Sequence, residues 1–271
     1  MIVDAHHHLW EDLARRDYDW LAGLDPIRRP YTVDDLVAVT PADRTVLVQT
    51  VPAVEETAEF LATAAATPLI AGVVGWVDLT APDVADRLAA LTTDELVGIR
   101  HPAQDEADPN WLVRPEVVRG IKAVAAADLT YDVLILPPQH EAAIALADAV
   151  PEARLVLDHA GKPAIADGGH EPWARFITEL SARPNVYCKL SGLVTEADWT
   201  QWTVDDLRPY AAHVLESFGP DRVMFGSDWP VCELAATYDE VLTAARACTE
   251  ELSPSEQDEV FAGTAVRAYR L

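Results

Sequence analysis

The sequence predicts one (β/α)8 barrel of the TIM type, a single domain over residues 1–271. Short apolar segments alternate with amphipathic, helix-like segments along the whole chain, which implies a parallel sheet. Eight such units in 271 residues match the size of a closed barrel. An open, doubly wound sheet is the second interpretation, but it predicts a glycine-rich loop after the first strand, where this chain has histidines at 6–8.

The elements can be placed by their hydrophobic pattern and by prolines at the joins, which favour helix starts and turns. The eight strands are expected at 1–6, 45–51, 69–77, 96–100, 131–136, 154–159, 186–191 and 222–228. The helices are expected at 53–66, 82–91, 115–127, 139–149, 172–182, 204–218 and 238–251, with a closing helix near 255–268.

The connection after the first strand is unusually long. Residues 10–44 are rich in Trp, Arg, Asp and Pro, and no linker or low-complexity tract divides the rest of the chain. In a barrel, this excursion is expected to form a lid-like loop over the end where the strands have their carboxyl termini.

Composition limits the partners and the compartment. The net charge of −25 argues against nucleic acid and anionic membranes, which need a basic surface. The chain shows neither a membrane-spanning apolar run nor a signal pattern, and its three cysteines lack metal-type spacing. We expect a cytoplasmic protein with reduced thiols that acts on a small molecule; a homo-oligomer is left open.

The most informative motif is Asp-Ala-His-His-His-Leu-Trp at residues 4–10. Alternate side chains of a strand share a face, so His6 and His8 point the same way and His7 the opposite way. Two neutral imidazoles on one face make half of a zinc-type metal site. The run is short and lies in a strand-like context, which argues against an N-terminal tag.

Polar residues recur where the other predicted strands end, and this is where barrel enzymes place their chemistry. They are Gln49, Trp76, Arg100, His101, His159, Lys162, Lys189, Asp228 and Trp229. Because ligand-type residues from independent strands converge, His6, His8, His159 and Asp228 are interpreted as functional.

The remaining positions have a structural alternative beside the functional one. Trp76 and Trp229 fit core packing as well as ligand stacking. Arg100 fits an internal salt bridge, and Gln49 a bond to the backbone. Strand parity lets only one of Arg100 and His101 point directly inward.

With these residues in view, the chain resembles the amidohydrolase superfamily and, within it, the amidohydrolase-2 group. The closer resemblance is to the lactonase branch that includes L-fuconolactonase, L-rhamnonolactonase and 2-pyrone-4,6-dicarboxylate lactonase. It rests on five motifs in the expected order: DAHHHLW at 4–10, GIRHPAQDE at 98–106, LVLDHAGKP at 155–163, VYCKLSGL at 186–193 and FGSDWPV at 225–231.

The resemblance implies a distorted barrel, a hydrolase, and a polar centre of His6, His8, His159 and Asp228. Two-metal members of the superfamily have a bridging lysine or a glutamate on strand four and a histidine on strand five. This chain has Arg100 and Leu134-Ile135-Leu136 there. We therefore expect at most one divalent ion, with zinc the favoured metal; members of this branch differ in whether they need one.

The expected reaction is hydrolysis of the lactone of a sugar acid or small carboxylic acid. Asp228 is the predicted general base, and His6, His8, Asp228 and His159 the predicted metal ligands, with His159 either a ligand or a donor to the oxyanion. The predicted substrate contacts are Gln49, Trp76, Arg100, His101, Lys162, Lys189 and Trp229.

Two other functions remain open at this point. One is a metal-dependent nonoxidative decarboxylase, since related enzymes on the same scaffold use one zinc ion and a similar set of His and Asp residues. The other is a barrel that binds a ligand without turning it over.

Overall fold

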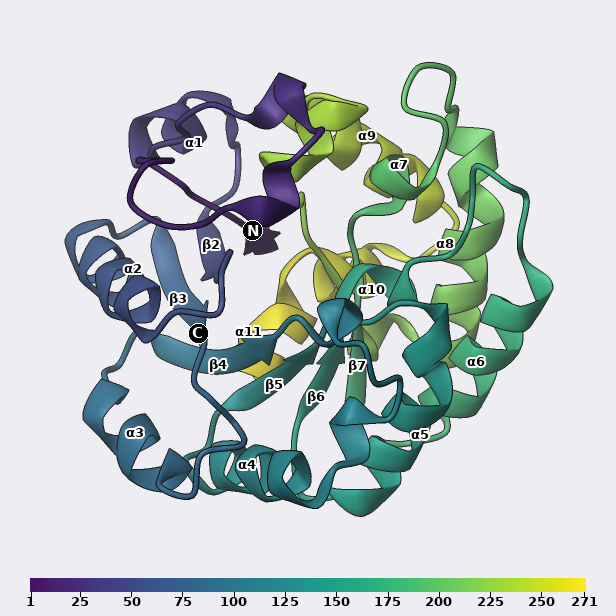
Figure 1. Cartoon of the computed structure of the whole chain (residues 1–271). Helices are drawn as coiled ribbons and strands as arrows, with labels where there is room; N and C mark the ends of the chain where they lie inside the picture. Colours follow the sequence, from purple (N-terminus) through teal and green to yellow (C-terminus); the bar gives the residue numbers. More distant parts are fainter.

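The computed structural model describes residues 1–271 and contains eight parallel strands that pair in sequence order, β1 to β8 (Figure 1). The strands are β1 (Val3–His7), β2 (Arg44–Val48), β3 (Ile70–Gly75), β4 (Leu96–His101), β5 (Thr130–Val133), β6 (Leu155–Leu157), β7 (Val186–Leu190) and β8 (Val223–Phe225). The backbone of β1 meets the segment after β8 through a parallel bridge between His7 and Trp229. There the His8 N–H donates to Trp229 O at 2.7 Å, so the barrel is nearly closed, as predicted.

Most of the helices follow the predicted pattern and cover the outside of the barrel. They are α1 (Val33–Val39), α2 (Val54–Ala66), α3 (Val84–Leu91), α4 (Pro115–Ala126), α5 (His140–Ala149), α6 (Glu171–Ser181), α7 (Leu193–Glu196), α8 (Val204–Phe218), α9 (Tyr238–Cys248), α10 (Pro254–Asp258) and α11 (Thr264–Tyr269). Capping boxes mark several starts, for example Thr237 with Glu240 at α9, because each side chain satisfies a free backbone N–H of the other residue.

Three details differ from the sequence expectation. The excursion contains a helix, α1, that the pattern did not predict, and the four-residue helix α7 was also missed. The closing helix is divided into α10, a π-helical turn at Glu259–Gly263, and α11.

None of the helices combines the length and the apolar character that a membrane span requires.

The closing segment covers the end of the barrel at which the strands begin. Ala262, Ala265, Ala268 and Tyr269 share one buried apolar cluster with the strand valines Val3, Val46, Val48, Val74, Val97 and Val156. Figure 1 shows α11, in yellow, lying across the strands in this view. Because this end of the barrel is filled, the barrel interior is open only at the opposite end, where the strands have their carboxyl termini. The polar residues lie at that open end.

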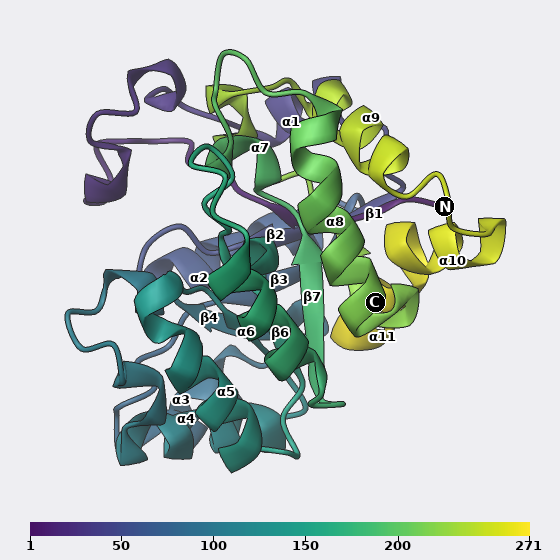
Figure 2. The same cartoon turned by 90° about the vertical axis from the view of Figure 1, so that its right-hand side faces the viewer.

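The excursion between β1 and β2 is attached to the barrel by its own aromatic residues. Trp10 and Tyr31 form an antiparallel bridge, and Trp10 makes edge-to-face contacts with Trp20 and Tyr31 at centroid distances of 5.2 and 5.1 Å. Tyr31 in turn meets Trp229 edge-to-face at 5.3 Å. Figure 2 shows this segment, in dark purple, projecting beyond the strands. Its role as a lid stays a prediction.

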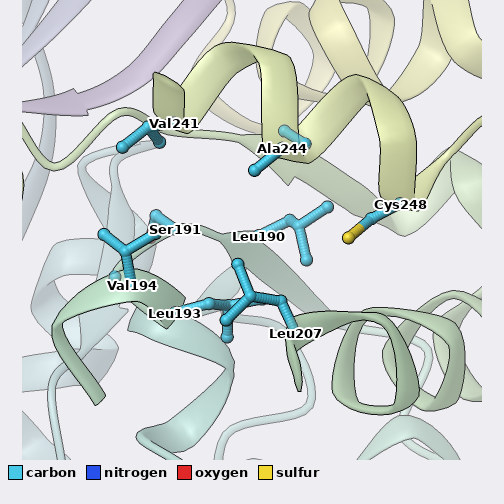
Figure 3. Close-up of a pocket in the computed structure, with 10 residues that line it drawn as sticks. Leu190, Ser191, Leu193, Val194, Leu207, Val241, Ala244 and Cys248 are labelled. Carbon is cyan, nitrogen blue, oxygen red and sulfur yellow. The ribbon is translucent and has the colours of Figure 1, made fainter. Parts of the chain in front are cut away.

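A small apolar cavity of about 30 Å³ lies between β7, α7, α8 and α9 (Figure 3). Leu190, Leu207, Val241 and Ala244 are among the side chains that line it. Its volume is close to that of one methylene group, so the surrounding side chains lose some dispersion contacts there.

The cavity leads to a stability prediction. Val241→Ile adds one methylene from α9 without changing β-branching, and it should raise the free energy of unfolding by about 0.5–0.8 kcal/mol. Val37→Ile is the matched control, because Val37 is 56 % exposed on α1 and should give no change. Denaturant melts of both variants would check this, and a destabilised Val241→Ile would show that the site cannot accept the added group.

Candidate active site

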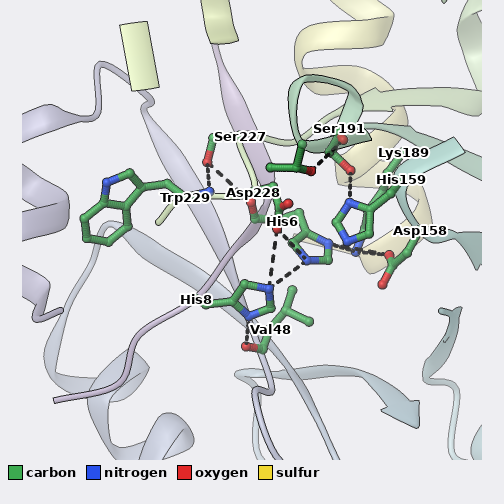
Figure 4. A network of polar contacts seen from close by, with 12 residues as sticks. His6, His8, Val48, Asp158, His159, Lys189, Ser191, Ser227, Asp228 and Trp229 are labelled. Carbon is green, nitrogen blue, oxygen red and sulfur yellow. Dashed lines mark hydrogen bonds and ion pairs between the residues drawn. The ribbon is translucent and has the colours of Figure 1, made fainter. Parts of the chain in front are cut away.

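His6 and His8 of the first motif point into the barrel at the carboxyl end of β1 (Figure 4). His6 and His8 are buried, and their Nε2 atoms are 3.0 Å apart. His159, directly after β6, lies beside His6 with a ring-centroid distance of 4.5 Å. Asp228, just after β8, has Oδ1 3.7 Å from Nε2 of both His6 and His8. The four residues predicted to form one centre therefore lie together.

The backbone around this centre adopts unusual conformations. Four consecutive residues have positive φ angles: His159 (52°), Ala160 (50°), Gly161 (68°) and Lys162 (52°). Asp228 has φ of 57°. Non-glycine residues rarely occupy this left-handed region, and such strain is concentrated at functional sites. Here it turns His159, Lys162 and Asp228 toward the same space.

Two glycines make room for the imidazoles. A Cβ on Gly192 would lie 2.7 Å from Nδ1 of His159, and Gly192 itself has φ of 66°. A Cβ on Gly226 would lie 2.7 Å from Cβ of His6. Both positions, one after β7 and one after β8, therefore require glycine for the observed close approach.

A hydrogen bond fixes the tautomer of at least one imidazole, so that its free ring nitrogen carries a lone pair. His8 donates through Nδ1 to the carbonyl of Val48 at 2.8 Å, so its Nε2 carries the lone pair in the neutral ring. His159 Nδ1 bonds Ser191 Oγ at 2.9 Å. Burial holds the pKa of His6, His8 and His159 well below the usual value, so the rings are neutral at physiological pH.

Asp228 differs from the other buried carboxylates because its side chain accepts no hydrogen bond, while its backbone N–H donates to His6 O at 2.8 Å. Burial raises the pKa of Asp228 to about 7, and the nearby cations Lys162 and Arg100 oppose this shift. A carboxyl group with such a pKa can exchange a proton near neutral pH.

This donor set fits a divalent cation. One ligand atom from each of His6, His159 and Asp228 lies within 4.8 Å of the others, and His8 Nε2 is close to two of them. Neutral imidazoles and a carboxylate are ligands that zinc-type ions prefer, and the spacings are compatible with one ion. The site therefore supports one divalent metal ion, as expected, without establishing which.

A neutral network of four charges lies beneath the imidazoles. Lys189 Nζ is 2.6 Å from Asp132 Oδ2, 2.9 Å from Asp158 Oδ1 and 3.0 Å from His6 Nδ1. Arg100 pairs with Asp158 Oδ2 at 3.0 Å and donates to Gln49 Oε1 at 2.8 Å. The Lys189, His6 and Arg100 groups outweigh the effect of burial and hold the pKa of Asp158 well below its usual value.

Asp4 joins the two strands that carry the centre. Its carboxylate accepts from the backbone N–H of His6 at 3.1 Å, from Ser227 Oγ at 2.6 Å and from Tyr238 Oη at 3.0 Å. It therefore links β1 with Ser227, the residue preceding Asp228, and supports the centre without being part of it.

A cavity of about 680 Å³ opens above the centre. His8, His159 and Asp228 line its floor together with Gln49, Arg100 and Lys162; Asp17, Asp19, Trp20 and Asp105 are further lining residues, from the excursion and from the loop after β4. Its volume suits a small-molecule substrate.

The seven predicted substrate contacts divide into two groups. Gln49, Arg100 and Lys162 line the cavity, whereas Trp76, His101, Lys189 and Trp229 do not. His101 accepts from Trp76 Nε1 at 3.0 Å and stacks on Trp111, so Arg100 is the member of its pair that points inward. Lys189 is fully buried among its ion-pair partners. Figure 4 shows the indole of Trp229 pointing away from the imidazoles.

Sequence reasoning missed Asp132 and Asp158 as supports of the centre, and Asp17, Asp19 and Asp105 at the cavity. A signal existed for the first two, since each is a lone carboxylate next to an apolar strand segment, and a buried charge needs a partner. The rim aspartates carry no such signal, because exposed acidic loop residues are common in a chain with a net charge of −25.

The fold and the site together define a barrel enzyme that activates water. The (β/α)8 barrel brings three neutral imidazoles and one carboxylate together at its strand ends, and these are residue types that can hold a divalent ion and accept a proton.

Comparisons with known proteins identify the family. The family model described as Amidohydrolase matches residues 3–271, and the chain belongs to this family. It is 42 % identical to an L-fucono-1,5-lactonase of Burkholderia multivorans, over 99 % of this chain and 96 % of that protein, and 39 % identical to one of Burkholderia ambifaria, over 99 % and 95 %. A solved amidohydrolase structure from Burkholderia multivorans with bound zinc is 40 % identical, with a TM-score of 0.95 over 100 % of this chain and 99 % of that chain.

These findings confirm the predicted family resemblance and favour the lactonase interpretation over the decarboxylase. Solved decarboxylase structures are also similar, but they are 15 % identical and show a shared fold only.

Proposed function

We propose that the protein hydrolyses L-fucono-1,5-lactone or a closely related sugar-acid lactone, with zinc as the favoured ion in its centre. The chain is a hydrolase of lactone ester bonds, which the full-length lactonase relatives support. The observation that carries the proposal is the Asp228 carboxylate, which is buried, accepts no hydrogen bond and faces two imidazoles at the floor of the cavity.

Asp228 is proposed to act first as base and then as acid. Its carboxylate removes a proton from the attacking water while the water oxygen forms a bond to the lactone carbonyl carbon. When the tetrahedral intermediate breaks its bond to the ring oxygen, Asp228 returns the proton to that oxygen. The product is an open hydroxy acid that ionises in neutral solution.

The other cavity residues are proposed to hold and polarise the substrate. Lys162, which forms no ion pair and lies near Asp228, can donate to the carbonyl oxygen as negative charge develops there. Gln49 has its Oε1 held by Arg100, which fixes the orientation of its amide group. His6, His8, His159 and Asp228 would hold the divalent ion, which when bound supplies Lewis acidity to the site.

The proposal can be tested with a pH-indicator screen of the purified protein against stereochemically defined aldono-lactones, with and without chelator. Acid release from L-fucono-1,5-lactone or a narrow set of related lactones is the expected result, and loss of rate with chelator, restored by zinc, would support the metal role. Carbon dioxide release from aromatic acids, without lactone opening, would instead favour a decarboxylase.

The pKa of Asp228 predicts the pH dependence. The base must be ionised and its pKa is about 7, so the residual kcat/KM that remains after chelator treatment should rise with pH and reach half its plateau near pH 7. A bound cation favours the ionised carboxylate, so zinc should move this limb to lower pH. Rate profiles from pH 5 to 9 would check both, and a flat profile would contradict the role of Asp228.

A further inference from the structure

The charged residues of the cavity fall into two groups. The cations lie beside Asp228 at the floor, and three further carboxylates come from other segments of the chain. The floor has Arg100 and Lys162 beside Asp228, while Asp17 and Asp19 come from the excursion and Asp105 from the loop after β4. All three of these aspartates are exposed and none forms an ion pair. The cavity wall therefore carries three carboxylates that have no ion-pair partner, and a substrate in the cavity lies near them.

The two floor cations are not equally available. Arg100 is committed to Asp158 and to Gln49, with bonds of 3.0 and 2.8 Å. Lys162 is the uncommitted cation, and like Arg100 it lies near Asp228, where the reaction develops negative charge on the carbonyl oxygen. A second anionic group on the substrate would find no free cation in this cavity.

The segment that carries Asp17 and Asp19 is held in place. The edge-to-face contacts of Trp20 with Trp10, and of Trp10 with Tyr31, anchor the turn at Asp19–Leu21. Arg16, which precedes Asp17 in the sequence, forms an ion pair with Glu59. Arg28 lines a neighbouring hollow with Asp17 and Asp19 but forms no ion pair with either.

We propose that this cavity selects neutral, hydroxylated lactones and rejects anionic ones, and that Asp17 and Asp19, with Asp105, are the residues that make the selection. Carboxylates accept hydrogen bonds from hydroxyl groups and repel a substrate carboxylate. This inference rests on the proposed lactone hydrolysis and deepens it by excluding dicarboxylate lactones as good substrates.

The test compares a neutral aldono-lactone with the aldaro-lactone of the same stereochemistry, which differs by one terminal carboxylate. If the two carboxylates act in water at a separation on the order of 10 Å from the substrate carboxylate, they should suppress its kcat/KM about fourfold at low ionic strength. Asp17→Asn/Asp19→Asn should raise kcat/KM for the aldaro-lactone by this factor. The same variant should lower kcat/KM for the neutral lactone by less than about threefold. Glu11→Gln/Asp34→Asn is the control with the same change in net charge, since neither residue lines the cavity.

Ionic strength gives a second measurement that needs no variant. Raising the ionic strength from about 0.01 to 0.15 M should bring the ratio of kcat/KM for the neutral lactone to kcat/KM for the aldaro-lactone closer to one in the wild type. The change should be smaller in Asp17→Asn/Asp19→Asn. Where the aldaro-lactone turns over too slowly, its inhibition constant against the neutral lactone replaces kcat/KM. An unchanged ratio in the variant, or an equal change in the control, overturns the inference, whereas no turnover of any neutral lactone overturns the proposed function itself.

Discussion

Asp228→Asn is expected to lower kcat by about a thousandfold or more, because the amide cannot take a proton from water or return it to the ring oxygen. Asparagine tolerates the left-handed backbone that residue 228 adopts, with φ of 57°, so the loop should keep its conformation. Single-turnover kinetics on a lactone that the wild type hydrolyses would measure the loss.

The same variant should be more stable than the wild type at alkaline pH. The folded-state pKa of Asp228 is raised from 3.8 to about 7, so the ionised carboxylate costs the folded state stability as pH rises through this interval. Above pH 7, Asp228→Asn should therefore gain roughly 2–4 kcal/mol in chelator-treated protein, and at pH 4 the difference should vanish.

A matched control separates these effects from a general loss of charge. Asp239→Asn changes an exposed carboxylate in the first turn of α9 and should alter neither kcat nor the pH dependence of stability by much. If Asp228→Asn retained more than a tenth of wild-type kcat, Asp228 could not be the base. If it lost stability at every pH, the side chain would have a structural role that its contacts do not show.

Lys189→Met is expected to give the largest loss of stability in the barrel interior, about 3–5 kcal/mol. The substitution keeps all but the last atom of the side chain's length but leaves Asp132 without its cation and Asp158 with Arg100 alone. Both carboxylates are fully buried, so the uncompensated charge has no solvent to interact with. Denaturant unfolding at pH 7 would measure the change.

A double variant tests whether the loss comes from the orphaned charge. Asp132→Asn/Lys189→Met removes one member of each sign, and it should recover a substantial part of the loss, since Asp158 still pairs with Arg100. The surface control is Arg87→Met, which breaks an exposed pair with Asp83 and should cost no more than about 0.5 kcal/mol. A loss below 1 kcal/mol for Lys189→Met would contradict the account of the network.

The sequence by itself determined the barrel and the four residues of the centre. Alternation of apolar strands and amphipathic helices depends on local periodicity, which survives without any knowledge of neighbours. His6 and His8 share a face because strand side chains alternate, and His159 and Asp228 join them because parallel strands end at the same edge. These placements follow from backbone geometry alone.

Only the tertiary structure decided which polar residues reach the cavity. The sequence placed all seven predicted substrate contacts at strand ends, but four of them are engaged by residues from distant segments and do not line the cavity. His101 stacks on Trp111, Trp229 meets Tyr31, and Lys189 pairs with Asp132. The fourth is Trp76, which donates to His101. The aspartates Asp17, Asp19 and Asp105 entered the cavity wall through the packing of loops. The physical reason is that the direction of a side chain follows from local geometry, but its partners depend on which segments the folded chain brings beside it.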